Sequence, residues 1–298
     1  MPARRPSDDA KVIGDDATVI GDAATVIAGA TSDVDGDAGK EPIFVIGSPR
    51  SGTTLLRLIL DAHPHISCGE ETHFLRDLEA IVGRHWNLVS TYGLGHDWWL
   101  ARIRGLYTDF QAAVLARSGK RRWAEKDPTY TLHLDFIEEL FPDARFVHLV
   151  RDGHDVVASF RDRWGYVSAA RAARSEWARY VEAASSLGRR LPSSRFLELR
   201  YERLVADSET EARRLFAFLG EPWDPAVLGI DPERHSATER YRWFTAQRRR
   251  SGGENAAIYR SRVGAGADSL DPILRTLLRR RHGRLLRELG YLGDGHAS

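Results

Sequence analysis

The sequence predicts an α/β fold, a three-layer sandwich with a central, mainly parallel sheet. Short apolar runs that suit buried strands alternate with helical stretches from residue 43 onward. Two of these runs, 43–46 and 145–150, lead directly into a tight turn and then a helix start. The length of 298 residues allows one large α/β domain with insertions.

Residues 1–40 differ in composition from the rest of the chain. They hold eight Asp against four Lys or Arg, a net charge of −4. A Val-Ile motif recurs every seven residues, and the Gly in each unit disfavours a helix. We predict an acidic, low-complexity, disordered tail over 1–40 and a single domain over 41–298. A weak partner-binding segment is the alternative.

Apolar runs and helical periodicity place the elements of the domain in order. The predicted strands are 43–46, 66–69, 122–125, 145–150 and 195–199. The predicted helices are 53–61, 130–141, 152–161, 169–188, 209–219 and 272–289. Gly220 and Gly290 follow the last two helices. A mostly helical, aromatic-rich insertion is expected at about 74–120, and residues 232–266 are expected to be irregular.

The segment 42–56 is the most informative part of the chain. Its strand stops at Gly47, and the loop and helix start that follow direct backbone N–H groups and a helix dipole at one point, which forms an anion site. Gly47 and Gly52 have the spacing of a Walker A loop, but Thr53 stands where its lysine belongs. The missing lysine argues against an ATPase or kinase, and Arg50 supplies the positive charge instead.

Hydroxyl groups surround this arginine. Ser51, Thr53 and Thr54 add donors, and Gly52 allows close approach of the backbone. An ordinary strand-to-helix turn with capping hydroxyls is the alternative. The convergence of one Arg and three hydroxyls on a single helix start favours a site for a tetrahedral oxyanion.

The segment 49–56, Pro-Arg-Ser-Gly-Thr-Thr-Leu-Leu, resembles the 5′-phosphosulfate loop of sulfotransferases that use 3′-phosphoadenosine-5′-phosphosulfate (PAPS). The motifs at 60–64 and 68–72, Leu-Asp-Ala-His-Pro and Cys-Gly-Glu-Glu-Thr, resemble the protein-tyrosine sulfotransferase branch and its bacterial relatives. The resemblance covers roughly residues 42–265. It implies a PAPS-dependent sulfotransferase that releases adenosine 3′,5′-bisphosphate (PAP).

A second block completes the expected nucleotide site. The strand 145–150 ends at Arg151, beside the same crevice as Arg50, because ligands bind outside the carboxyl ends of strands. Ser159 lies about two helical turns further on, and Arg163 one turn beyond it. The resemblance implies that Arg151 and Ser159 grip the 3′-phosphate. A surface ion pair is the alternative for Arg151.

The resemblance assigns three further positions to the nucleotide site, and the residues themselves support these assignments less strongly. Tyr201 resembles the Tyr that touches the nucleotide, with a packed core residue as the alternative. Ser261 and Arg262 match the loop that closes the 3′-phosphate site, although Asp268 stands where that loop usually has a basic residue.

Sulfuryl transfer needs a proton acceptor, donors around the sulfuryl oxygens and stabilisation of the bridging oxygen. The resemblance assigns Arg50, Thr53 and Thr54 to the sulfonyl and 5′-phosphate oxygens. Lys126, in Lys-Asp-Pro-Thr, aligns with the Lys that contacts the bridging oxygen, and a surface Lys is the alternative. No His, Cys or Asp cluster has metal-ligand spacing, so no metal is predicted.

Glu71 falls where the tyrosine sulfotransferases keep their catalytic base, so it is the predicted base and should be partly buried. The adjacent Glu70 is expected to face structure or solvent. In another sulfotransferase branch the base is a His, which leaves His73 and His133 as alternatives.

Composition limits the partners and the compartment. The net charge of +1 does not indicate a nucleic-acid binder, and no apolar stretch reaches the ~20 residues of a membrane span. Cys68 is the only cysteine, so no intrachain disulfide forms, and a small buried residue is expected there. Without a signal-peptide pattern, we expect a cytoplasmic protein. The oligomeric state stays open, a homodimer included.

The acceptor is the least determined part of the prediction. Trp86, Trp98, Trp99 and Tyr107 can line an acceptor pocket within the insertion, although aromatic residues on helices more often form a core. A hydroxyl of a small molecule, glycan or lipid is favoured, with peptide tyrosine as the alternative. A P-loop-type nucleotide kinase and a non-catalytic nucleotide-binding protein are the alternatives from other classes.

Overall fold

The computed structural model describes residues 41–229, 263–264, 266 and 269–292. All of them belong to one unit, Lys40–Ser298. Its centre is a five-stranded sheet in the order β2-β3-β1-β4-β5, with every pair parallel. The strands are β1 (Ile43–Ile46), β2 (Ile66–Cys68), β3 (Arg122–Lys126), β4 (Arg145–Val150) and β5 (Phe196–Arg200). The predicted α/β class with a parallel sheet is confirmed.

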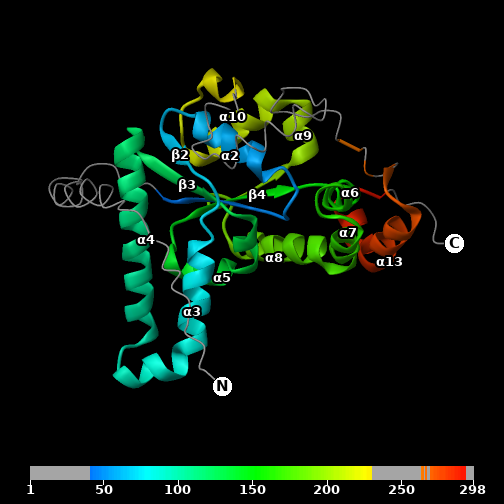
Figure 1. Cartoon of the computed structure of the whole chain (residues 1–298). Helices are drawn as coiled ribbons and strands as arrows, with labels where there is room; N and C mark the ends of the chain where they lie inside the picture. The colour runs from blue at the N-terminus through cyan, green and yellow to red at the C-terminus, as the bar shows by residue number, and fades with distance from the viewer. Residues whose placement is uncertain (1–40, 230–262, 265, 267–268, 293–298) are drawn as a thin grey trace, which may run out of the picture. The chain divides into compact units, whose positions relative to one another are not determined.

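Side chains of the central strands alternate between two hydrophobic cores, because successive residues of a strand point to opposite faces. Ile43 and Val45 pack with α2 (Thr53–Ala62), α9 (Tyr201–Ala206) and α10 (Ser208–Leu219). Phe44 and Ile46 pack on the other face with α3 (Phe74–Val89), α4 (His96–Ser118), α5 (Leu134–Leu140) and α8 (Trp177–Arg190). Figure 1 shows α2, α9 and α10 on one side of the sheet and α5 and α8 on the other.

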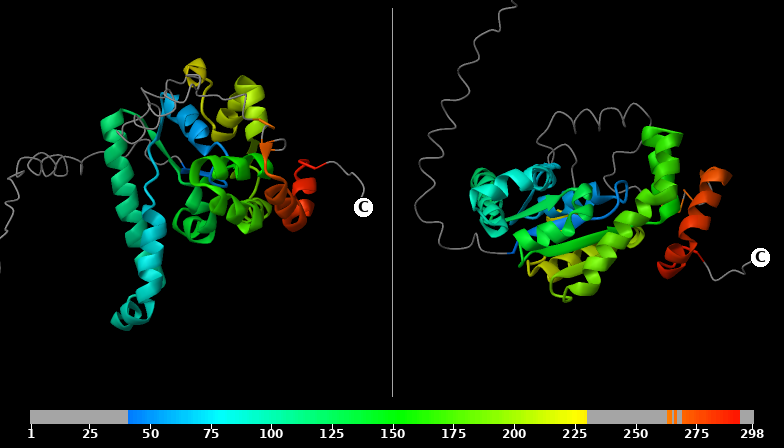
Figure 2. Two further views of the ribbon diagram at one scale, coloured as in Figure 1. Left: turned by 45° about the vertical axis from the view of Figure 1, so that its right-hand side comes forward. Right: turned by 90° about the horizontal axis from the view of Figure 1, so that it is seen from below.

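A third cluster extends the fold beyond β4. It joins α6 (Gly153–Trp164), α7 (Tyr166–Arg171), the π-helical turn η3 (Ala172–Glu176), α8 and α13 (Pro272–Glu288). Figure 2 shows α13 beside this group of helices in both views. Trp177 is its largest fully buried side chain. This cluster fixes α6 directly after β4, where Arg151 and Ser159 are expected.

Three elements differ from the sequence prediction. The single helix predicted over 169–188 is divided into α7, η3 and α8. The predicted helix 130–141 is divided into η2 (Pro128–Leu132) and α5 at His133. Asp127 starts η2 early, because its side chain accepts from Thr129 N at 2.9 Å and Pro128 suits the first helical position. The helix α9 was not predicted, since its six residues carry too little periodic pattern. The tail 1–40 and most of 232–266 lie outside the described residues.

The remaining predicted elements match to within a few residues. The insertion consists of α3, the short turn η1 (Ser90–Tyr92) and α4, and η4 (Pro225–Leu228) follows α10. Cys68 is fully buried, and burial raises the pKa of its thiol to about 12. Among the described residues, no helix has both the length and the apolar composition that a membrane span requires.

Candidate functional site

The carboxyl ends of the five strands lie along one edge of the sheet, because all pairings are parallel. Each strand brings one predicted site residue to this edge. They are Arg50 after β1, Glu71 after β2, Lys126 at the end of β3, Arg151 after β4 and Tyr201 after β5. The topology therefore gathers residues that are distant in sequence, at the edge where open α/β sheets bind ligands.

The loop between β1 and α2 depends on two glycines. Gly52 has φ 95°, and a Cβ there would lie 2.3 Å from a ring carbon of Tyr201. Gly47 has φ 148°, and a Cβ there would lie 2.6 Å from the carbonyl oxygen of Leu149. Thr131 fixes the start of the loop, since its hydroxyl accepts from Gly47 N at 2.9 Å and donates to Gly47 O at 3.2 Å.

The start of α2 has the properties of an anion site. Its first turn carries no acidic residue, and no side chain among the described residues caps it. Ser51 is 1% exposed, and its Oγ has no hydrogen-bond partner within the part of the chain that the structure describes. A buried hydroxyl beside uncapped helix N–H groups suits a bound oxyanion. Thr53 is also buried, whereas Thr54 is exposed.

The two predicted arginines are linked at the ends of adjacent strands. Arg151 Nη1 donates to the carbonyl oxygen of Arg50 at 3.3 Å. Arg50 Nε donates to Ser159 Oγ at 3.0 Å, and its guanidinium lies 5.6 Å from the ring centre of Trp164. Tyr201 packs against the guanidinium of Arg151, 4.2 Å from ring centre to Cζ. The structure thus brings the predicted 5′ and 3′ halves of the nucleotide site together.

Arg50 also has an unusual backbone conformation. Its φ of 73° and the φ of 57° at His73 are the positive values of non-glycine residues in the described part of the chain. Both residues lie in loops at the carboxyl edge. Strained backbone of this kind clusters at binding and active sites.

Asp155 connects this network to the C-terminal part of the chain. It pairs with Arg151 Nη2 at 3.3 Å and accepts from the backbone N–H groups of Gly264 at 3.0 Å and Gly266 at 2.7 Å. The predicted closing loop therefore reaches α6 at these two glycines. Its predicted contact residues, Ser261 and Arg262, lie outside the described residues.

The predicted catalytic pair lies at the end of β3. Lys126 is 2% exposed and its Nζ donates to Glu71 Oε1, whereas the Glu71 side chain is about one-third exposed. Glu70 turns the other way and pairs with the buried Arg57 at 3.2 Å, as expected for a structural residue. His133 pairs with Glu79 of α3.

Two neighbours of Lys126 also hold the loop after β2. Asp127 is fully buried, and its Oδ2 lies 2.5 Å from His73 Nδ1. Glu125 is 2% exposed and its Oε1 accepts from Thr72 Oγ1 at 2.9 Å and from Thr72 N at 3.3 Å. Burial raises the pKa of Glu125 to about 7. Neither Glu125 nor Asp127 was predicted to serve the site.

The four aromatic residues named for an acceptor pocket lie in different places, apart from Trp98 and Trp99, whose ring centres are 5.1 Å apart. Tyr107 is fully buried in the core, packed on Trp123 and Phe141, so it cannot line an open acceptor site. Trp86 and Trp98 flank the turn between α3 and α4, which Figure 1 shows at the end of this hairpin away from the sheet.

Arg163 is exposed on α6, one turn beyond Ser159.

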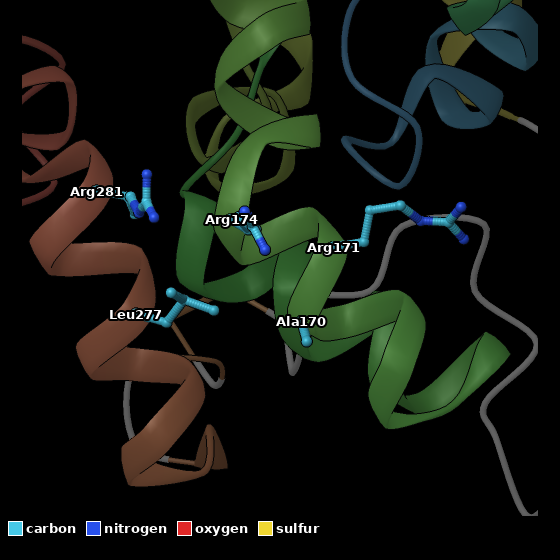
Figure 3. Close-up of a pocket in the computed structure, with 5 residues that line it drawn as sticks. All are labelled: Ala170, Arg171, Arg174, Leu277 and Arg281. Carbon is cyan, nitrogen blue, oxygen red and sulfur yellow. The ribbon is translucent and has the colours of Figure 1, made fainter.

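A surface cavity of about 460 Å³ lies apart from the strand ends, between η3 and α13. Its lining residues are Ala170, Arg171, Arg174, Leu277 and Arg281. Figure 3 shows Leu277 and Arg281 on α13 across from Arg174, with the Arg171 side chain directed away from α13. Since it contains none of the predicted site residues, the cavity is not the predicted site.

Two groups of His and carboxylate side chains come together in the described part of the chain. One consists of His63, His65 and Glu221, and the other of Glu71, His73 and Asp127. Arg121 and Arg122 pair with Glu221, and Lys126 pairs with Glu71. Because cations of the protein already neutralise both glutamates, neither group is assigned to a metal.

The fold is an α/β fold, and its site combines a loop that suits an oxyanion with two linked arginines at adjacent strand ends. The model of the sulfotransferase family matches residues 42–225, and the chain belongs to this family. The chain is 31% identical over 199 residues to protein-tyrosine sulfotransferase A of Caenorhabditis elegans, which covers 62% of this chain and 51% of that protein. It is 33% identical over 196 residues to human protein-tyrosine sulfotransferase 1, and this match covers 62% of this chain and 53% of the human protein.

The chain therefore spans about half the length of these curated relatives. Among solved structures, the sulfotransferase domain of a Synechococcus olefin synthase superposes with a TM-score of 0.59 at 25% identity. That match covers 82% of this chain and 94% of that domain. The fold of the whole described unit is thus that of a sulfotransferase domain.

Proposed function

We propose that this protein transfers the sulfuryl group of PAPS to a hydroxyl group, and that the acceptor is a peptide tyrosine. The observation that carries the proposal is the joining of the two arginine loops. Arg151 bonds to the backbone of Arg50, and Arg50 bonds to Ser159, at the ends of adjacent strands. A nucleotide with anionic groups at both ends requires two such basic sites close together.

The residues present suit this nucleotide. Ser51 Oγ is buried without a partner among the described residues, and uncapped N–H groups of α2 lie beside it. Arg50, Thr53 and Thr54 would hold the 5′ end, and Arg151 and Ser159 the 3′-phosphate. Tyr201 would limit the depth of the site, because its ring already contacts Gly52 and Arg151.

Lys126 and Glu71 would serve the transfer itself. PAPS supplies a sulfuryl group on a phosphosulfate anhydride, which the acceptor oxygen attacks. Glu71 accepts the proton of the attacking hydroxyl, and the one-third exposure of its side chain lets an acceptor approach. Lys126 pairs with Glu71 in the resting site and would supply positive charge where the leaving oxygen becomes negative.

The relatives support peptide tyrosine better than the small-molecule, glycan or lipid hydroxyl that the sequence favours. Both curated relatives compared above are named protein-tyrosine sulfotransferases. The preference for a small acceptor depends on the expectation of a cytoplasmic protein alone. Tyr107, one of the four aromatic residues considered for an acceptor pocket, is buried in the core and does not line one.

An acceptor screen with ³⁵S-labelled PAPS tests the proposal. The panel contains tyrosine peptides, simple phenols, sugars and a lipid alcohol. We expect label on tyrosine peptides and a loss of about 10²-fold or more in rate with Glu71→Gln. Glu70→Gln, the adjacent glutamate that pairs with Arg57, is the matched control and should retain transfer. Tight PAP binding without label on any acceptor would contradict the proposal.

A further inference from the structure

Three consecutive residues at the end of β3 hold three consecutive residues of the loop after β2. We call these contacts the β3-end network: Glu125 with Thr72, Lys126 with Glu71, and Asp127 with His73. Glu71 is the predicted base, so the network fixes the segment that carries it. Lys126 contacts Glu71 and Asp127 contacts His73, and both of these loop side chains are partly exposed. Glu125, in contrast, is itself buried.

Every partner of Glu125 is a hydrogen-bond donor. Its Oε1 accepts from the Thr72 backbone and hydroxyl, and its Oε2 accepts from Gln111 Nε2 of α4 at 3.4 Å. Because both oxygens face donors, the ionised carboxylate suits all partners and a protonated oxygen would oppose one of them. Burial acts in the other direction, since it disfavours the charged form.

The contact with Thr72 is part of a longer chain of hydrogen bonds. Leu75 N, at the start of α3, donates to Tyr130 Oη at 3.0 Å, and Tyr130 Oη lies 3.1 Å from Thr72 Oγ1. Since Thr72 donates to Glu125, Tyr130 donates to Thr72. The ionised form of Glu125 therefore orders the loop from Thr72 to the start of α3. Glu71 is the next residue before this ordered stretch.

We propose that Glu125 is a positioning residue for Glu71, and that its ionised carboxylate holds the loop in the conformation that sulfuryl transfer requires. Glu125 touches neither the acceptor nor the nucleotide and acts through Thr72. The inference rests on the proposed function, because it concerns the same base. It predicts that transfer depends on the protonation of a buried side chain as well as on that of Glu71.

The surroundings of Glu125 place its ionisation near neutral pH. Burial raises its pKa to about 7, hydrogen bonds from Tyr107 and Thr72 oppose the rise, and the negative charge of Asp127 adds to it. The other titratable groups that face it are Tyr130 of η2 and Cys68 of β2, and burial raises the pKa of both above its usual range. Neither ionises near pH 7. His73, which follows Thr72 and contacts Asp127, adds an imidazole to the network, so the Glu125→Gln variant is needed to assign a titration near pH 7 to Glu125.

The first test follows the loop without any acceptor. The ¹⁵N–¹H signal of Thr72, whose N–H donates to Glu125, is recorded from pH 5.5 to 8.5 in the wild type and in Glu125→Gln. We expect one titration near pH 7 in the wild type and its loss in the variant. Gln111→Leu, which removes a donor to the carboxylate, should move the titration to higher pH. A Thr72 signal that titrates equally in all three proteins overturns the proposal.

The second test measures transfer from ³⁵S-labelled PAPS to a tyrosine peptide. We expect the wild-type kcat to rise with pH through about 7, and Glu125→Gln to lose this rise and about tenfold of kcat while PAP affinity stays the same. Thr72→Val should lower kcat similarly, and the double variant should be no worse than the poorer single variant. Glu70→Gln, the control, should keep the wild-type pH profile.

The outcomes separate this inference from the proposed function. A wild type that binds PAP and labels no acceptor counts against the proposed function, and the Thr72 titration then decides the role of Glu125. Transfer whose pH profile is unchanged by Glu125→Gln overturns the inference and leaves the proposed function standing. Additive losses from Thr72→Val and Glu125→Gln also overturn it, because they would show independent effects.

Discussion

The two edges of the sheet carry similar charged side chains and use them differently. The strand β3 begins with Arg122 and ends with Lys126, and β4 begins with Arg145 and is followed by Arg151. At the amino edge, Arg122 donates to Glu221 at 3.2 Å, to Leu219 O at 2.6 Å and to Glu41 O at 2.9 Å. These contacts pair the buried charges of Arg122 and Glu221 and join the sheet to the end of α10.

The carboxyl edge retains capacity for a ligand. Ser51 Oγ has no partner among the described residues, the start of α2 is uncapped, and Glu71 is about one-third exposed beside Lys126. The same contrast applies to the two histidine clusters. Two arginines pair with Glu221 at the amino edge, whereas Asp127 holds His73 in the loop beside the predicted base. Residue type therefore does not distinguish a site from a structural cluster, but the exposure of the paired carboxylate does, since Glu221 is buried and Glu71 is about one-third exposed.

Arg122→Met should cause the largest change, and it should be a change of stability. Removing Arg122 breaks its buried ion pair with Glu221 and takes the donor from the carbonyl oxygens of Leu219 and Glu41, which costs about 3–5 kcal/mol although Arg121 still pairs with Glu221. Urea denaturation measures the loss, and PAP titration of the folded variant should give the wild-type affinity. Normal stability together with weakened PAP binding would break the distinction between the edges.

Lys126→Met should have the opposite profile. We expect kcat to fall by about 10²- to 10³-fold, because positive charge is lost at the leaving oxygen. Stability should change less than in Arg122→Met, since Glu71 is partly exposed and water can solvate it. Single-turnover transfer and urea denaturation provide the two measurements. A variant that loses stability but keeps kcat would assign Lys126 to structure.

Glu125 should make stability depend on pH. Its pKa is raised from 4.5 to about 7, so the folded protein binds a proton more tightly than the unfolded chain. The resulting stabilisation is present below about pH 4.5 and is lost as pH rises to about 7, which amounts to about 3 kcal/mol. Urea denaturation from pH 5 to 8 should show this decline in the wild type. An equal decline in Glu125→Gln would assign it to other groups.

Ser51→Ala should have the smallest effect. The variant loses a hydroxyl donor to the bound oxyanion, so PAP affinity should fall about threefold to tenfold. Stability should stay constant or rise slightly, because a buried hydroxyl with no partner among the described residues is removed. Calorimetry with PAP and thermal unfolding measure both quantities. A clear loss of stability would show that Ser51 serves the fold.

The central strands could be predicted because they are buried on both faces. The bounds of β1 and β4 match the prediction, since their continuous apolar runs have clear ends. The prediction of one continuous helix over 130–141 was wrong, although the local sequence indicates an earlier helix start. Asp-Pro-Thr at 127–129 is a helix start, and it could have placed the break before Leu134.

The positions of Arg50 and Arg151 could be predicted, because Arg151 directly follows β4 and Arg50 lies in the short loop after β1. Glu125 could not, because it lies inside a strand and its role depends on contact with Thr72, which is 53 residues away. Thr131 meets Gly47 across 84 residues, and Asp155 meets Gly266 across 111. Such contacts are set by the packing of the whole fold and leave no local pattern in the sequence.

Calorimetric titration of PAP into matched variants of β4 tests the central claim most directly. Arg145→Ala removes the arginine at the amino end of the strand, where it donates to Phe218 O, and Arg151→Ala removes the one after its carboxyl end. We predict about 10- to 100-fold weaker PAP binding for Arg151→Ala, the cost of losing charged hydrogen bonds, and wild-type affinity for Arg145→Ala. Equal losses in both variants, or wild-type affinity in Arg151→Ala, would contradict a nucleotide site at the carboxyl edge.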